Sequence, residues 1–142
     1  MLFRSDVAWT KKVAEHDVIS RREIAMHAGR YVDSTGDGLL AVFEGPATAV
    51  RCAKAISEAI RPLGLEIRAG VHTGELESDG SRVRGIAVHI GARVMSLAGP
   101  SEILASSMVK DLTAGSGLRF ESAGEHELKG VPEPLHLYRV VR

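Results

Sequence analysis

The sequence is poor in cysteine and in aromatic residues, carries no net charge and contains no long hydrophobic run. Its 142 residues include one cysteine, Cys52, and aromatic residues make up 4%. Basic and acidic residues number 18 each, so no broad nucleic-acid or membrane footprint is expected. Because one cysteine cannot pair within the chain, a reducing, cytoplasmic setting is favoured. No segment has the length of a membrane span or the character of a secretory signal.

The overall composition is typical of a globular protein, and residues 1–142 are expected to form one domain. Hydrophobic residues make up 44% and charged residues 25%, which are ordinary values for a globular protein. A chain of this length can bury a real core. With so few aromatic residues, that core must be aliphatic, and Cys52 is expected to be one of its small members.

Hydrophobic periodicity and turn residues predict an alternation of helices and strands. The first helix is expected to bury Trp9 and Met26, and residues 75–84 are expected to form a flexible connection. Helices are expected over residues 5–28, 46–60, 85–97 and 106–112, a hairpin of two strands over 30–44, and further strands over 65–73, 102–105, 117–122, 125–128 and 135–141. This order predicts an α+β fold in which helices pack on a mainly antiparallel sheet.

The stretch 31–43 reads as strand, tight turn, strand, with Gly36-Asp37-Gly38 at the turn. Glycine and aspartate are the usual residues of such turns. A carboxylate held at a turn between small neighbours can also bind Mg²⁺, which prefers oxygen ligands. From the hairpin alone, the simpler interpretation is that Asp37 only makes the turn.

Two further candidates lie on the helix expected over residues 85–97. His89 and Arg93 are four residues apart, so they share one face, and two such side chains can hold an anion. The alternative from spacing alone is a surface arginine beside a packed histidine. His72, at the end of the strand 65–73, has no neighbours at metal-ligand spacing and is expected to be structural.

Four ordered motifs resemble the class III adenylate/guanylate cyclase catalytic domain, in particular its compact, actinobacterial-type bacterial members. They are 34–41 (STGDGLLA), 67–75 (IRAGVHTGE), 85–93 (GIAVHIGAR) and 127–131 (ELKGV). The similarity extends over about residues 5–141, and four motifs in the family's order are more specific than any one of them.

The resemblance implies a ferredoxin-like core of βαββαβ type that forms a head-to-tail homodimer with active sites at the interface. It also implies a lyase that converts ATP, or GTP, into the 3′,5′-cyclic nucleotide and pyrophosphate. In the family, two Asp residues hold two divalent ions, Mg²⁺ or Mn²⁺, on the nucleotide phosphates. Positioning and charge neutralisation then supply most of the rate of phosphoryl transfer.

Carried over by position, the resemblance assigns Asp37 as a metal ligand, Arg93 as the transition-state arginine and Lys129 as a phosphate ligand. It places Asp33 and Arg82 at the base-contacting positions and His89 at a ribose-orienting position.

Four departures from the family pattern accompany these matches. The family's first strand, with its first metal Asp, is apparently missing, because residues 1–4 run directly into the first expected helix and Asp6 does not match that Asp. This strand is either upstream of the chain or lost. Asp33 stands where the family has Lys, Arg82 where it has an acid, and His89 where it has Asn.

The sequence therefore predicts a class III nucleotidyl cyclase domain with weak or no activity, since a two-metal site with one Asp loses affinity and geometry. Two alternatives remain open. One is a non-catalytic dimerisation or nucleotide-sensing module that keeps the cyclase fold. The other is an unrelated ferredoxin-like protein that binds a small molecule.

Overall fold

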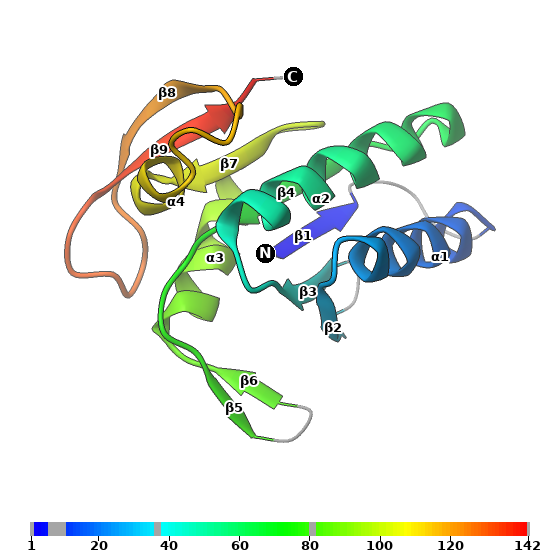
Figure 1. Ribbon diagram of the computed structural model, residues 1–142, viewed down its shortest axis with the longest axis horizontal. Coiled ribbons are helices and arrows are strands. Elements are labelled where there is room, and N and C mark those ends of the chain that lie inside the picture. Colours follow the sequence, from blue (N-terminus) through cyan, green and yellow to red (C-terminus); the bar gives the residue numbers. More distant parts are fainter. Residues whose placement is uncertain (1, 6–10, 36–37, 80–81, 142) are drawn as a thin grey trace.

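The computed structural model describes residues 2–5, 11–35, 38–79 and 82–141 (Figure 1). Within these residues the helices are α1 (Lys11–Met26), α2 (Pro46–Ile60), α3 (Ile86–Leu97) and α4 (Ser107–Leu112), and a 3₁₀ turn, Arg61–Leu63, follows α2. The strands are β1 (Leu2–Ser5), β2 (Arg30–Thr35), β3 (Gly38–Val42), β4 (Ile67–Val71), β5 (Glu77–Asp79), β6 (Arg82–Arg84), β7 (Ile103–Ser106), β8 (Phe120–His126) and β9 (Leu135–Val140).

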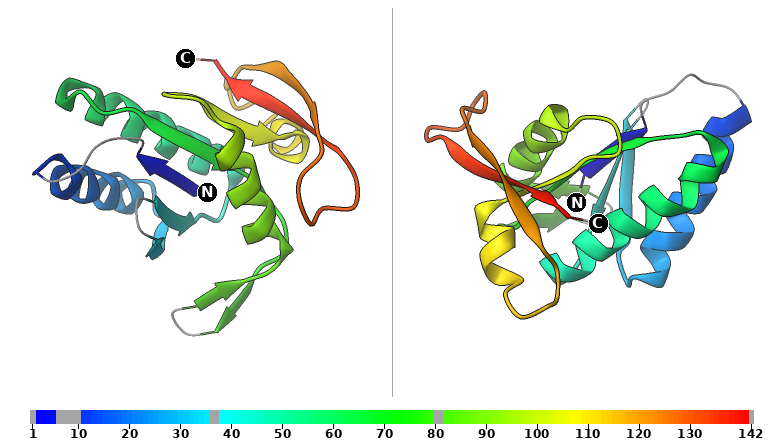
Figure 2. Two further views of the ribbon diagram at one scale, coloured as in Figure 1. Left: turned by 180° about the vertical axis from the view of Figure 1, so that it is seen from behind. Right: turned by 90° about the horizontal axis from the view of Figure 1, so that it is seen from above.

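Seven of the described strands form one sheet in the order β2-β3-β1-β4-β7-β9-β8, and β5 pairs with β6 separately. The β4–β7 pair is parallel, and the other pairs in the described part of the chain are antiparallel. The first four strands of the large sheet, with α1 and α2, have the chain order and neighbours of a ferredoxin-like βαββαβ unit. Figure 2 shows α3 on the face of the sheet opposite α1 and α2. The predicted α+β, mainly antiparallel architecture is confirmed.

The prediction that the first strand is missing was wrong. Residues Leu2–Ser5 form β1, which lies between β3 and β4: Leu2 pairs with Leu40 on one side and with Gly70 on the other. Four residues carry too little pattern to be recognised as a strand, since much of the preference for a strand comes from its neighbours in the sheet. Here hydrogen-bonding partners on both sides define the strand.

Three smaller predictions also need correction. Residues 75–84, expected to be a flexible connection, contain the β5–β6 hairpin that projects from the domain in Figure 1. Met26, expected on a buried face, is 70% exposed. The two strands expected over 117–122 and 125–128 are one strand, β8, with an irregular register between Ser122 and Glu125. The side chain of Trp9 lies outside the described residues.

The core is aliphatic, as the composition predicts. Ile67, Ala69 and Val71 alternate along β4 and are fully buried among the side chains of the main core cluster. Cys52 of α2 is also fully buried, which confirms its expected role as a core residue. Burial raises the pKa of the Cys52 thiol to about 12, so this cysteine stays protonated and unreactive at neutral pH.

Gly70 allows α3 to pack directly on β4. A Cβ at Gly70 would lie 2.4 Å from the backbone nitrogen of Met95 and 2.8 Å from the carbonyl oxygen of Gly91. Real Cβ atoms do not approach backbone atoms this closely, so any larger residue would push α3 away from the sheet. The position of α3, which carries two of the predicted site residues, therefore depends on this glycine.

Candidate functional site

Helix α3 carries His89 and Arg93 one turn apart, and it starts after Gly85, whose φ of +140° glycine adopts without strain. Both side chains are half-buried. Among the described residues, the Arg93 guanidinium has no ion-pair or hydrogen-bond partner. A half-buried guanidinium without a protein partner is available to an anionic ligand.

The loop 127–134 between β8 and β9, here called the Lys129 loop, reaches α3. His89 Nε2 donates a hydrogen bond to the carbonyl oxygen of Lys129, 2.8 Å away. Leu128 is buried in a second apolar cluster that includes Val94 of α3. The structure therefore brings His89, Arg93 and Lys129 into one region, although Lys129 lies 40 residues beyond His89 in the sequence.

Gly130 is needed for this contact. Its φ is +82°, and a Cβ there would lie 2.8 Å from His89 Nε2. Glycine adopts this conformation readily and leaves the space empty. The sequence Lys129-Gly130 is thus the arrangement that lets the loop backbone approach the histidine.

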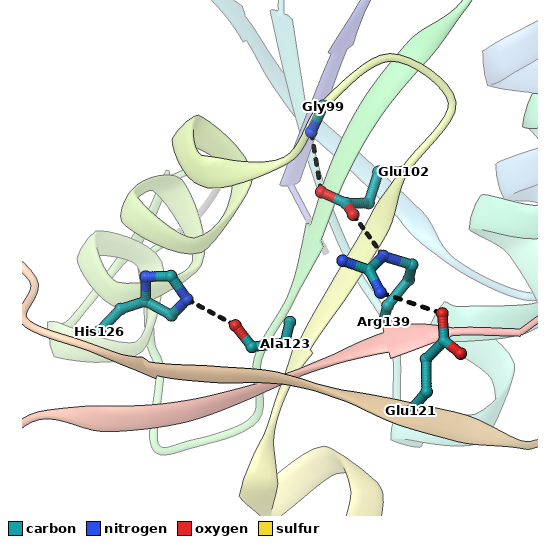
Figure 3. A network of polar contacts seen from close by, with 6 residues as sticks. All are labelled: Gly99, Glu102, Glu121, Ala123, His126 and Arg139. Carbon is teal, nitrogen blue, oxygen red and sulfur yellow. Dashed lines mark hydrogen bonds and ion pairs between the residues drawn. The ribbon is translucent and has the colours of Figure 1, made fainter.

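Polar contacts fix the strands that carry the Lys129 loop (Figure 3). Glu102 accepts hydrogen bonds from the Gly99 N–H at 2.9 Å and from Arg139 Nε, and Arg139 also pairs with Glu121 at 3.0 Å. Burial alone would raise the pKa of Glu102, but the hydrogen bonds from Arg139 and Gly99 outweigh it, so the pKa lies below its ordinary value. This carboxylate stays ionised and joins β7 to β9.

The remaining predicted site residues are only partly described. Asp37 lies outside the described residues. Asp33 is in β2, opposite Leu40, and Arg82 is the first residue of β6, opposite Asp79; the structure describes the backbone of these two residues but not their side chains. The base-contacting positions of Asp33 and Arg82 thus stay a prediction.

The end of β1 lies beside the hairpin that carries Asp37. Arg4 of β1 pairs with Gly38, the residue that follows Asp37. The strand that sequence reasoning missed therefore pairs with β3, whose first residue follows the predicted metal ligand in the sequence. Its residues, Leu2 to Ser5, contain no carboxylate, and Asp6 follows them in the sequence.

No metal centre can be built from the described residues alone. Within them, no group of three or more His, Cys, Asp or Glu side chains is placed to hold an ion. The structure thus gives no geometry for a metal.

A cavity of about 80 Å³ lies where β3 and β4 end and α2 and α3 begin. Sequence reasoning did not find it, because its walls come from three separate stretches of the sequence, 40–49, 71–76 and 87–91. His72 lines it, and His72 Nδ1 lies 2.7 Å from Ser106 Oγ, a contact within the fold as expected for a structural histidine. Burial lowers the pKa of His72, so its ring is neutral at pH 7.

Comparison with known proteins shows which proteins this chain resembles. No family model matches the chain. A protein of Rhizobium meliloti named "Putative adenylate cyclase 3" is 29% identical over 124 residues, which are 81% of this chain and 21% of that relative. The chain spans 14% and 16% of the lengths of two further curated relatives.

Solved cyclase structures match the whole domain. An adenylate/guanylate cyclase/hydrolase from Silicibacter pomeroyi has a TM-score of 0.79 at 26% identity, and the match covers 99% of this chain and 95% of that one. A guanylate cyclase domain from Catenaria anguillulae in complex with GTP has a TM-score of 0.78 at 19% identity, with 99% and 94% covered.

The resemblance to the class III adenylate/guanylate cyclase catalytic domain is thereby confirmed. The chain has the fold of this domain and is similar in sequence to a cyclase relative. In the described part of the chain, no helix is both long and apolar enough to cross a membrane.

Proposed function

We propose that this cyclase-type domain binds a nucleoside triphosphate, ATP or GTP, with Mg²⁺ or Mn²⁺ at the interface of a homodimer in the cytoplasm. The proposed reaction is the family's conversion of ATP to 3′,5′-cyclic AMP and pyrophosphate, at a weak or absent rate. One observation carries the proposal: the contact between α3 and the Lys129 loop brings Lys129, which is 40 residues beyond His89 in the sequence, to the helix that carries His89 and Arg93.

The two cations of this region suit a polyphosphate. The guanidinium of Arg93 can donate two parallel hydrogen bonds to one phosphate, while the ammonium of Lys129 acts as a point charge. The Lys129 side chain is exposed and, among the described residues, has no partner. In phosphoryl transfer, charge that spreads over the phosphate oxygens is stabilised by such fixed cations.

We assign the remaining roles on the basis of the resemblance. Asp37 would hold the divalent ion, which when bound neutralises phosphate charge and activates the attacking hydroxyl. Asp33 and Arg82 would contact the base, and His89 would stand beside the ribose. Because the Leu2–Ser5 strand lacks a carboxylate, the matched positions supply a single metal ligand, which supports the expectation of weak turnover.

A homodimer is supported by apolar side chains on and beside α3. Ile86 is 58% exposed, Leu97 43% and Leu76 42%. A helix on one face of a sheet, with apolar side chains in solvent, is suited to an interface. This face also carries the site, so a second copy would cover it.

The test is calorimetric titration with a slowly hydrolysed ATP or GTP analogue and Mn²⁺, together with an assay for cyclic AMP and cyclic GMP. We expect measurable binding and little or no product. Removing the cation of Arg93 or Lys129 by substitution with Ala should weaken binding about tenfold each, since hydrogen bonds to charged groups contribute about 1.5–3 kcal/mol when buried and less when exposed.

Arg22→Ala is the matched control. Arg22 is an exposed cation on α1, on the face of the sheet opposite α3. Its removal changes the net charge by the same amount, so an equal loss of affinity in Arg22→Ala would show that only overall charge matters. Robust cyclase turnover would contradict the expected weak activity, and no binding of either analogue would contradict the nucleotide site.

A non-catalytic module is the second candidate, and one observation favours it. His89 Nε2, at the position that the resemblance assigns to the ribose, is already bonded to the carbonyl of Lys129. Nucleotide binding without turnover, even at saturating Mn²⁺, would decide for this module.

A further inference from the structure

We infer that His89 is a positioning residue for Lys129. Its hydrogen bond to the Lys129 carbonyl fixes the backbone from which the lysine side chain extends, and so places that cation relative to Arg93 on the same helix. The inference rests on the proposed function, because the placed cations are those proposed to bind a polyphosphate. It differs from the role that the resemblance assigns to this position.

The contact determines which nitrogen of His89 carries the proton. A carbonyl oxygen accepts hydrogen bonds and never donates them, so Nε2 must carry a proton in this contact. In the neutral ring, Nδ1 is then a bare acceptor. Among the described residues Nδ1 has no partner, so it remains able to accept a hydrogen bond from a ligand hydroxyl.

Apolar side chains on both sides of Lys129 and Gly130 pack on α3 or its neighbours, but neither of these two residues is part of that packing. Leu128 is 6% exposed and lies in the cluster with Val94, and Val131 packs against the same cluster. The Val131 N–H donates to the Leu128 carbonyl at 3.0 Å and closes a tight turn around Lys129 and Gly130. Among the described residues, the hydrogen bond from an α3 side chain to this turn is the one from His89.

The glycine after the lysine supports the same reading. A Cβ at Gly130 would occupy the space next to Nε2, and this conformation strains any residue with a side chain. Substitution of Gly130 would therefore break the contact from the loop side, whereas substitution of His89 breaks it from the helix side.

The first test needs no nucleotide. In the full chain, ¹⁵N chemical shifts of the neutral His89 ring should show the proton on Nε2 and not on Nδ1. Amide hydrogen exchange at residues 129–131 should become roughly three- to tenfold faster in His89→Ala, the effect of losing one hydrogen bond. His89→Gln, whose side-chain amide can donate to the same carbonyl, should restore much of the protection.

The matched control is His126→Ala. His126 Nε2 donates to the carbonyl oxygen of Ala123 at 2.8 Å, the same kind of contact as that of His89, but its two partners both lie within β8 (Figure 3). It should leave exchange at residues 129–131 unchanged. If His126→Ala and His89→Ala accelerate this exchange equally, the loop responds to general destabilisation and the inference fails.

The second test is a double-mutant cycle with sodium tripolyphosphate as the probe in calorimetry. If His89 acts through Lys129, His89→Ala should lose several-fold affinity in the wild-type background and almost none in the Lys129→Ala background. His89→Gln should bind close to wild type. Equal losses in both backgrounds would overturn the inference, because His89 would then act independently of Lys129.

The two tests separate this inference from the proposed function. Unchanged exchange at residues 129–131 in His89→Ala overturns the positioning role whatever the chain binds. Faster exchange in that variant supports the contact between His89 and Lys129. If the wild-type chain nevertheless binds neither tripolyphosphate nor nucleotide, the proposed polyphosphate site is overturned, although the contact itself stands.

Discussion

At Gly70, the addition of a single methyl group should strongly lower the free energy of unfolding. Gly70→Ala places a Cβ 2.4 Å from the Met95 nitrogen, so β4 and α3 must separate. We expect a loss of about 2–4 kcal/mol in the free energy of unfolding, a large effect for one methyl group but in the range of severe overpacking. Urea denaturation followed by circular dichroism measures it.

Gly91→Ala is the matched control for Gly70. Gly91 lies on α3 itself, and a Cβ there would meet nothing within 4 Å. Alanine is favoured over glycine inside a helix by about 1 kcal/mol, so this variant should be as stable as the wild type or more so. Equal destabilisation by both substitutions would contradict the packing described for α3.

His72 should make stability depend on pH. Burial lowers its pKa in the folded state below the value of 6.5 that it has when unfolded. The unfolded chain therefore binds the proton more readily, and stability is complete above pH 6.5 and falls as the pH drops through the folded-state pKa. Thermal unfolding between pH 7.5 and 5 should show a decline that is smaller in His72→Asn, and an identical decline in both would contradict the assignment.

At the scale of elements, β1 is the strand on which the sheet depends. It separates β3 from β4 and pairs with both. Removal of residues 1–5 would leave two central strands with open backbone groups, a far larger loss than that of an edge strand. We expect the shortened chain to lose its cooperative thermal transition, measured by circular dichroism. A cooperative transition at an unchanged temperature would contradict the central position of β1.

The elements that sequence reasoning found are those with a strong local pattern. The alternation of Ile67, Ala69 and Val71 identified β4, and Pro46 marked the first residue of α2 as the structure has it. Helix α3 differs from its expected range by one residue. In each of these elements the periodicity of burial is carried by the segment itself.

The elements that were missed depend on contacts that the local sequence does not contain. The four residues of β1 become a strand through β3 and β4. In the segment 75–84 the residues flanking the turn are polar, so no hydrophobic alternation marks the β5–β6 hairpin. Met26 is apolar and exposed, which periodicity alone does not exclude.

In the candidate site too, sequence reasoning found what a local pattern carries and missed what depends on a contact between distant residues. His89 and Arg93 could be placed on one helix face from their spacing, whereas the contact of His89 with Lys129 joins residues 40 positions apart and left no signal in either segment. The sequence alone left an anion site and an unrelated surface arginine as alternatives. The contact with the Lys129 loop adds a third candidate residue to the same region.

At the scale of the whole molecule, the proposed homodimer makes a prediction about α3. Replacing Ile86 or Leu97 with Glu would put a charge into the proposed interface, where an unpaired buried charge is costly. We expect sedimentation velocity to show dimers for the wild type and monomers for these variants. Met108→Glu is the control, because Met108 is 50% exposed on α4, away from α3.

The most direct test of the proposed nucleotide site is calorimetric titration of the full chain with a slowly hydrolysed ATP analogue and Mn²⁺, repeated for Arg93→Ala, Lys129→Ala and Arg22→Ala. We expect binding by the wild type, about tenfold weaker binding by each of the first two variants, and unchanged binding by the third. Absence of binding by the wild type, or equal losses in all three variants, would contradict a nucleotide site at α3 and the Lys129 loop.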